Sequence, residues 1–201
     1  MSKAIGIDYS LTGPAACQHP LDKPWNISNC KFVYMTSNIR KYVYKYSVKN
    51  ITFEGLAIPD YDNNMMRFIQ NAKIIKTWCS PEEGDSIAIE GYSFGSKGRS
   101  IFQIGEATGI LVLFMMFNSS GSGFINNKRV PYRPAPTEIK KMATDKGNAS
   151  KDQMYDAWLD ETKIDLKKLF DTSTIKSPIN DIVDSYWICK WVFQKEVKSN
   201  E

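Results

Sequence analysis

Lys3-Ala-Ile-Gly-Ile-Asp-Tyr9 is a short, nearly continuous apolar run, interrupted near its end by one acid, Asp8. Such a run predicts a strand buried on both faces, as found in sheets that helices cover from both sides. The stretch Ser86-Ile-Ala-Ile-Glu90 repeats the pattern, because it is also short, apolar and ended by an acid. Open α/β sheets bind their ligands where strands end, so we expect Asp8 and Glu90 to point towards one place.

The rest of the chain predicts an α/β fold with a central mixed sheet flanked by helices, in a single domain over residues 1–201. Residues 36–52 are polar and tyrosine-rich, and we read them as a loop flanking a further strand. Gly105, Ala107 and Gly109 are expected to let their helix pack closely on the sheet. The other predicted strands are 14–18 and 30–35. The predicted helices are 62–79, capped by Asp60 or Asp62, 100–117, 136–142, 150–158, capped by Ser150, and 179–194, opened by Pro178. Residues 91–100 and 162–177 are expected to be mostly loop.

Composition narrows the class of protein. Hydrophobic residues make up 42% of the chain and charged residues 24%, which is ordinary for a soluble globular domain. The longest apolar run, residues 110–117, is too short to span a bilayer. The N-terminus leads directly into the first predicted strand, so no signal peptide is expected. These features predict a cytoplasmic protein with no membrane partner.

The cysteines and the single histidine exclude several kinds of site. The four cysteines are scattered without a C-x-x-C pair, so neither a disulfide framework nor a structural zinc site is expected. Cys17 and His19 could share a metal, but two ligands do not close a site, and we read them as a buried thiol and a histidine on a surface loop. Any metal chemistry must therefore rest on oxygen ligands.

The net charge of +4 is compatible with a polyanionic partner but does not indicate one. The distribution of the basic residues along the chain is more informative. Lysine and arginine gather in a few short segments with aromatic residues among them, which is the pattern of a nucleic-acid-binding surface. On composition alone, an ordinary solvated surface explains the same pattern. The basic clusters are Lys97/Arg99, Lys128/Arg129/Arg133, Lys140/Lys141/Lys146/Lys151 and Lys167/Lys168, and the aromatic residues among them are Tyr92, Phe94, Phe102 and Tyr132.

Two further acids, Asp181 and Asp184, are spaced i, i+3 in the last predicted helix, so they share one helical face. Acids are also favoured at a helix N-terminus, and that structural reading explains the pair about as well. Together with Asp8 and Glu90, they form the kind of carboxylate cluster that binds Mg²⁺ or Mn²⁺. Two such ions can activate a water molecule and stabilise a leaving oxygen in phosphodiester hydrolysis without a protein nucleophile.

These motifs, taken in order, resemble the RuvC family of Holliday-junction resolvases, which has an RNase H-like fold. The acidic motifs are Ile5-Gly-Ile-Asp8, Ile87-Ala-Ile-Glu90 and Asp181-Ile-Val-Asp184. Ile104-Gly-Glu-Ala-Thr-Gly109 looks like the family's glycine-containing helix, and residues 139–151 look like its segment with two functional basic residues. The resemblance runs over about residues 3–192.

The resemblance implies a homodimer that cuts four-way DNA junctions symmetrically with two Mg²⁺ ions per site, Mn²⁺ substituting. It implies that the four acids bind the metal and that Lys140 and Lys151 lie near the scissile phosphate. Tyr92 or Phe94 would stack on a splayed base, although packing on the next helix explains them equally well. The insertions at residues 22–59 and 159–177 depart from the compact bacterial pattern and leave the substrate open, so branched DNA in general is expected. A phage-type member of the family is expected. The expected DNA-binding residues are Tyr92, Phe94, Lys97, Arg99, Lys140, Lys141, Lys146 and Lys151.

Three alternatives remain open on the sequence. A related nuclease for forks and flaps would use the same site, and only a substrate panel separates it from a strict resolvase. Residues 5–12 also look like the first phosphate loop of actin-like sugar kinases and ATPases, but that fold needs two such domains and a later glycine-rich loop. A non-catalytic DNA-binding protein on the same fold is the third reading, and the presence of all four acids argues against it.

Overall fold

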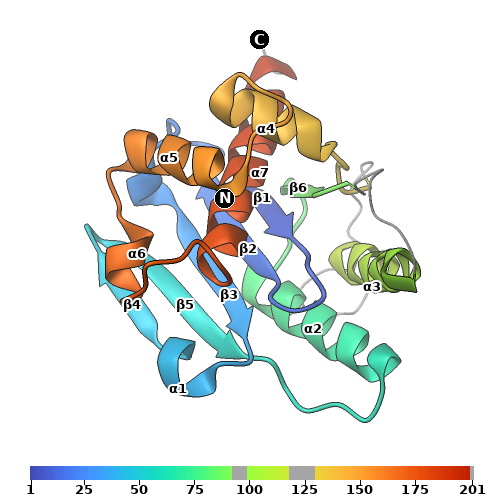
Figure 1. Cartoon of the computed structure of the whole chain (residues 1–201). Helices are drawn as coiled ribbons and strands as arrows, with labels where there is room; N and C mark the ends of the chain where they lie inside the picture. The colour runs from blue at the N-terminus through green and yellow to red at the C-terminus, as the bar shows by residue number, and fades with distance from the viewer. Residues whose placement is uncertain (92–98, 118–129, 200–201) are drawn as a thin grey trace.

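A six-stranded mixed sheet forms the centre of the computed structural model, which describes residues 1–91, 99–117 and 130–199 (Figure 1). The first strand pairs antiparallel with the second and parallel with the sixth, so the carboxyl ends of the first and sixth lie at one edge of the sheet. The strands are β1 (Lys3–Asp8), β2 (Ala15–Pro20), β3 (Lys31–Thr36), β4 (Lys45–Val48), β5 (Ile51–Ala57) and β6 (Ser86–Ile89), in the spatial order β4-β5-β3-β2-β1-β6.

Helices cover both faces of this sheet. One apolar core lies between the sheet and α2 and α3, and a second lies between the sheet and α4, α5 and α7 (Figure 1). The α/β architecture predicted from the sequence is therefore confirmed. The helices are the 3₁₀ turn Ile27–Asn29, α1 (Ile39–Tyr42), α2 (Asn64–Cys79), α3 (Arg99–Met115), α4 (Pro136–Thr144), α5 (Lys151–Thr162), α6 (Leu166–Leu169) and α7 (Ile179–Ser199).

Strand β1 sends alternate side chains to the two cores. Ile5 and Ile7 belong to the core under α2 and α3, whereas Ala4 belongs to the core under α7. Gly6 lies on the α7 side, where an added Cβ would stand 2.1 Å from the backbone nitrogen of Cys189. Because no other residue leaves that space, Gly6 allows α7 to lie directly on β1. Asp8 has the same parity as Ala4 and Gly6, so its side chain projects towards the start of α7.

The edge of the sheet beyond β6 is extended by a short segment that leads into α4. The backbone nitrogen of Tyr132 donates to Ile87 at 2.8 Å, and the oxygen of Tyr132 accepts from Ile89 at 3.0 Å. The nitrogen of Gly91 then donates to the oxygen of Pro134 at 2.8 Å. This parallel pairing brings the start of α4 beside the residue that follows β6, which is Glu90.

Most of the predicted elements are confirmed within a few residues, including the capping of α5 by Ser150 and the start of α7 after Pro178. Residues 36–52 were predicted to be mostly loop, but they contain α1, β4 and the start of β5. The predicted caps of α2 were wrong: Asn63 is the N-cap, and its side chain accepts from the nitrogen of Met66 at 3.0 Å.

Two other expectations are corrected. Gly105 and Gly109 do not bring α3 close to the sheet, because a Cβ on either would meet no described atom within 4 Å. Ala107 is the small residue of the three that is buried, at 2% exposure. His19 is not on a surface loop but is fully buried in β2, where its ring contacts the rings of Trp25 and Phe193. None of the described helices is both long and apolar enough to cross a membrane.

Candidate active site

The carboxyl ends of β1 and β6 each present one acid. Asp8 is the last residue of β1 and is only 9% exposed. Glu90 follows β6 directly, and its backbone nitrogen donates to the oxygen of Ile7 at 3.2 Å, so it lies beside the end of β1. Parallel pairing of β1 with β6 thus places both side chains at the same edge, as the sequence predicted.

The first turns of α7 bring the other two acids to this edge. Asp181 is 4% exposed and Asp184 is half-buried. Two side chains hold the Asp181 carboxylate: Ser177 Oγ donates to Oδ2 at 2.5 Å, and Asn180 Nδ2 donates to Oδ1 at 2.6 Å. Gly13, in the turn between β1 and β2, lies against the same group, since its Cβ would stand 2.9 Å from Asp181 Oδ2.

The four carboxylates act on one another. Burial raises the pKa of Asp8 well above its usual range, and the negative charges of Asp181, Asp184 and Glu90 raise it further. Burial, with the charges of Glu90 and Asp181, raises the pKa of Asp184 to about 7. Burial also raises the pKa of Asp181 to about 6 and that of Glu90 above its ordinary value. A cluster of like charges in a poorly solvated place favours the proton-bound or cation-bound form.

Three basic side chains partly oppose this repulsion. Lys151, the first residue of α5, lowers the pKa of Asp8, Asp181 and Asp184. Lys140, on α4, lowers that of Glu90 and Asp184. Arg133 also lowers the pKa of Glu90, and this residue was not among the site residues predicted from the sequence. The structure therefore gathers the four predicted acids with Lys140 and Lys151 around one edge of the sheet.

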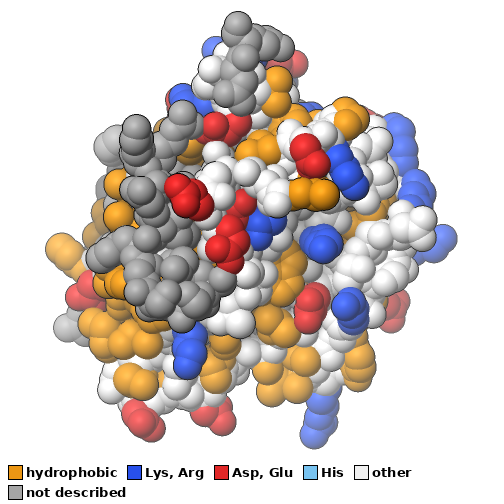
Figure 2. Space-filling view, turned by 180° about the vertical axis from the view of Figure 1, so that it is seen from behind, with side chains coloured by type: hydrophobic (Ala, Val, Ile, Leu, Met, Phe, Trp, Pro, Cys, Tyr) orange, Lys and Arg blue, Asp and Glu red, His pale blue; other side chains and the backbone are white. Residues whose placement is uncertain are grey.

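The remaining predicted DNA-binding residues are not brought into this group. Lys141 and Lys146 are exposed, and neither is among the charges that shift the four carboxylates. Tyr92, Phe94 and Lys97 lie outside the described residues, and only the backbone of Arg99 is described, at the start of α3. The face of the molecule in Figure 2 shows basic side chains interspersed with acidic ones rather than one continuous basic surface.

The donor set suits a hard divalent cation, because it consists of carboxylate oxygens with raised pKa values. Among the described residues, however, no three His, Cys, Asp or Glu side chains stand close enough together to hold a metal ion as they are. The carboxylates are near enough to feel one another's charge but are not drawn into a coordination shell. Cation binding would thus have to draw these side chains closer together, and the positive charge would offset their mutual repulsion.

The Cys17–His19 pairing does not form a second metal site. His19 Nδ1 lies 2.6 Å from the oxygen of Pro20, and Nε2 accepts from the nitrogen of Asn26 at 3.3 Å. Both ring nitrogens are thus engaged within the protein, and the ring stacks on Trp25 with 4.6 Å between centroids. Burial lowers the pKa of His19, so it stays neutral in the core.

The shifted carboxylates predict an unusual pH dependence of the metal-free fold. The pKa values of about 6 for Asp181 and about 7 for Asp184 exceed the ordinary 3.8, so between these limits the folded state binds more protons than the unfolded state. Their contribution to the free energy of unfolding should therefore fall as the pH rises from about 4 to about 7. Thermal unfolding in the presence of a chelator at several pH values measures this pH dependence of stability.

Asp184→Asn provides the comparison, because it removes one titrating group and should flatten the difference between pH 5 and pH 7.5. Mg²⁺ should raise the melting temperature of the wild type most at pH 7.5, where the carboxylates are ionised; at a hundred times its dissociation constant the gain is about 2.7 kcal/mol. Identical pH profiles for the two proteins, with no shift in Mg²⁺ or Mn²⁺, would count against a shared site.

Neither a protein-family model nor a curated protein sequence matches the chain. Its fold is similar to two solved structures of RuvC from Thermus thermophilus. The first matches with a TM-score of 0.51 and 12% identity, over 96% of this chain and 95% of that chain. The second, RuvC in complex with a Holliday junction substrate, matches with a TM-score of 0.56 and 12% identity, over 99% of this chain and 98% of that one. At this identity the likeness shows the fold, and it confirms the RNase H-like, α/β prediction.

Proposed function

We propose that this chain is a metal-dependent endonuclease of branched DNA, in which Asp8, Glu90, Asp181 and Asp184 hold two Mg²⁺ or Mn²⁺ ions. One observation carries the proposal: the charges of Glu90, Asp181 and Asp184 all act on Asp8, and burial raises the pKa of each of the four acids. Structural neighbours with a junction-resolvase fold support it. Bound at these carboxylates, the ions supply an activated water and charge neutralisation at the scissile phosphate.

The protein's own groups then have defined tasks. Ser177 and Asn180 fix the Asp181 carboxylate by two hydrogen bonds, so its oxygens face the site in one orientation. Lys140 and Lys151 offset part of the negative charge and are available to hold a DNA phosphate. Arg133, beside Glu90, is a third candidate for phosphate contact. His19 takes no part, because both its ring nitrogens are bonded in the core.

The proposed substrate is branched DNA, with four-way junctions as the first choice. This follows the Holliday junction named for the structural neighbour, and the sequence resemblance implies the same substrate. A homodimer with two sites would cut two strands of such a junction symmetrically. In that role, as a crossover junction endodeoxyribonuclease in DNA recombination and repair, the protein would act in the cytoplasm. Phage origin stays a prediction that belongs to the sequence resemblance.

A second candidate function follows from the spacing of the acids. Because no three described ligands stand close enough to hold a metal, a branched-DNA-binding protein without cleavage activity is compatible with the same structure. The two candidates differ in one respect that can be measured, since only the nuclease requires the carboxylates to converge on a cation.

A panel of labelled substrates tests the proposal. Four-way junction, fork, flap, plain duplex and RNA–DNA hybrid of matched sequence are incubated with the protein and Mg²⁺, and cut positions are mapped. The proposal expects junction cleavage at paired positions with 5′ phosphate ends, and little cleavage of duplex. Equal cleavage of forks and flaps would indicate the broader nuclease. Tight metal-independent junction binding with no product on any substrate would favour the non-catalytic candidate.

A further inference from the structure

A pocket of about 320 Å³ opens at the same edge of the sheet as the four carboxylates. Its walls come from segments that follow the carboxyl ends of parallel strands. Leu11 and Thr12 follow β1, and Ile58 follows β5, where its nitrogen donates to the oxygen of Thr36 at 3.0 Å. We call this cavity the turn pocket. Its principal lining residues are Leu11, Thr12, Ile58, Asp60, Tyr61 and Arg67.

The turn between β1 and β2 touches both the turn pocket, through Thr12, and the proposed metal site, through Gly13. Gly13, next to Thr12, lies against Asp181, where its Cβ would stand 2.9 Å from Oδ2. The nitrogen of Gly13 also donates to Ser10 Oγ at 3.0 Å, which holds the turn between β1 and β2 in place. The carboxylates and the pocket thus lie on either side of this one turn. A DNA strand with one phosphate at the carboxylates would bring a neighbouring nucleotide to the pocket.

The chemistry of the turn pocket suits a flat, partly polar ligand. The Arg67 guanidinium lies 5.3 Å from the centroid of the Tyr61 ring and 5.1 Å from that of Phe68. Arg67 Nε is buried and has no hydrogen-bond partner in the described part of the chain. Tyr61 is 42% exposed, so part of its ring stays open to solvent beside the Arg67 guanidinium. The site therefore offers an exposed aromatic ring held beside a guanidinium, whose Nη1 donates to Tyr61 Oη at 3.4 Å.

A nucleobase fits these features better than a phosphate does. Asp60 stands at the rim, where its carboxylate would repel a phosphate but can accept from the amino or ring N–H group of a base. Leu11 and Ile58 supply apolar walls for the faces of a ring. The pocket volume of about 320 Å³ lies near the lower limit for ligand pockets, which is about 300 Å³. Proteins that take a base out of its stack hold it by aromatic stacking and by hydrogen bonds to its edge.

We propose that the turn pocket receives one unpaired nucleobase next to the scissile phosphate, stacked on the Tyr61–Arg67 pair and read at its edge by Asp60. The inference rests on the proposed function, because it presupposes a DNA strand at the four carboxylates. Branched DNA suits such a pocket, since an unpaired or weakly paired base costs least to extract near a branch point. Tyr61 and Arg67 would be positioning residues that set which nucleotide lies at the cut.

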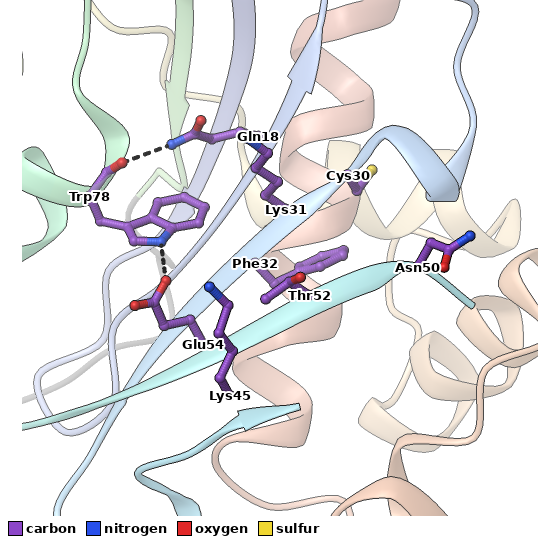
Figure 3. Close-up of a pocket in the computed structure, with 9 residues that line it drawn as sticks. All are labelled: Gln18, Cys30, Lys31, Phe32, Lys45, Asn50, Thr52, Glu54 and Trp78. Atoms are coloured by element: carbon purple, nitrogen blue, oxygen red, sulfur yellow. Dashed lines mark hydrogen bonds between the residues drawn. The ribbon is translucent and has the colours of Figure 1, made fainter. Parts of the chain in front are cut away.

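A second cavity, shown in Figure 3, does not share this position. Lys31 and Thr52 lie near the amino ends of β3 and β5, so this cavity is at the opposite edge of the sheet from the carboxylates. Its Trp78 indole already donates to Glu54 Oε2 at 3.1 Å. It therefore serves as a control location for the experiment below.

Binding of a four-way junction, measured in chelator, tests the inference. Tyr61→Ala and Arg67→Ala should each weaken binding about tenfold, the scale of one lost base–aromatic contact. An abasic site is placed in turn at each nucleotide beside the branch point, to find the position that faces the pocket. At that position, the wild type should bind the abasic junction more weakly than the intact one, by a similar factor. The variants should bind this abasic junction no worse than the intact one, because the same contact is already lost.

Two control variants match the substitutions. Tyr44→Ala removes another exposed tyrosine, and Lys31→Ala removes a basic residue of the second cavity; both should bind like the wild type. Arg67→Lys keeps the charge but loses the planar surface, so it should weaken junction binding about as much as Arg67→Ala does. Melting curves of all variants separate loss of contact from loss of fold. Wild-type binding by folded Tyr61 and Arg67 variants, or abasic and variant losses that simply add, would overturn the inference.

The design also separates failure of the inference from failure of the proposed function. If the wild type cuts no DNA but the abasic and Tyr61 losses are coupled, the pocket stands and the nuclease proposal falls. If the wild type cuts junctions and no abasic position is coupled to Tyr61 or Arg67, the nuclease proposal stands and the pocket inference falls.

Discussion

Replacing Asp8 by asparagine is expected to lower the rate of junction cleavage by about a thousandfold or more, equivalent to about 4 kcal/mol of transition-state stabilisation. Asp8 is the acid whose charge interacts with all three other carboxylates, so its loss should affect every cation bound there. Asparagine keeps the shape of the side chain but supplies no negative charge to a hard cation. Single-turnover cleavage of a labelled junction in Mg²⁺ measures the effect.

The same substitution should stabilise the metal-free protein, because it removes a buried negative charge from a repulsive cluster. Loss of activity together with a higher melting temperature in chelator would be hard to attribute to misfolding. Asp145→Asn is the matched control, since Asp145 is an exposed acid at the end of α4 with a left-handed backbone that asparagine tolerates. If Asp8→Asn retained more than a tenth of the wild-type rate, Asp8 would not be a ligand.

Replacing Gly6 by alanine is expected to destabilise the fold by about 3 kcal/mol or more, at the upper end of the range for overpacking a core. The new Cβ would stand 2.1 Å from the nitrogen and 2.5 Å from the Cα of Cys189, and 2.6 Å from the oxygen of Ser185. These are backbone atoms of α7, so no side chain can move aside and the helix itself must shift. Denaturant unfolding followed by circular dichroism measures the loss.

A shift of α7 would also carry Asp181 and Asp184 away from Asp8, so surviving Gly6→Ala protein should bind metal and cut DNA poorly. Gly109→Ala is the control, because its Cβ meets no described atom and its helical position favours alanine by up to about 1 kcal/mol. That variant should be slightly more stable than the wild type. Wild-type stability of Gly6→Ala would mean that α7 and β1 are not in the contact described.

The sequence predicted the parts of the fold that depend on local patterns. Strands β1 and β6 are short apolar runs ended by acids, and α5 and α7 begin at residues with clear N-terminal signals. The hairpin of β4 and β5 was missed for a physical reason. Its turn, Lys49 and Asn50, has φ values of 49° and 67°, which are usually adopted by Asn-Gly or Gly-Gly pairs. A lysine in the first position gave no signal of such a turn.

For the candidate site, the sequence predicted the acids but not what surrounds them. Apolar neighbours made Asp8 and Glu90 conspicuous, whereas Ser177, Asn180 and Gly13 look like ordinary loop or helix residues. Their role depends on contacts between segments far apart in the chain, and periodicity does not encode such contacts. Arg133 belongs with them, because only the pairing of its segment with β6 brings it near Glu90.

His19 was misplaced for a related reason. A histidine next to proline is typical of a loop, yet the aromatic cluster of Trp25 and Phe193 encloses it. The proline that ends β2 accepts a hydrogen bond from the ring, so burial leaves the imidazole satisfied. The enclosure of His19 by these two rings cannot be predicted from composition.

Anomalous diffraction from crystals grown in Mn²⁺ shows whether the four carboxylates bind cations, because it locates the ions independently of any activity. We expect manganese peaks among Asp8, Glu90, Asp181 and Asp184, with the side chains closer together than in the metal-free structure. The same crystals of Asp8→Asn should have lost at least one peak. Saturating Mn²⁺ with no peak among these four acids, or with peaks only elsewhere, would contradict this expectation.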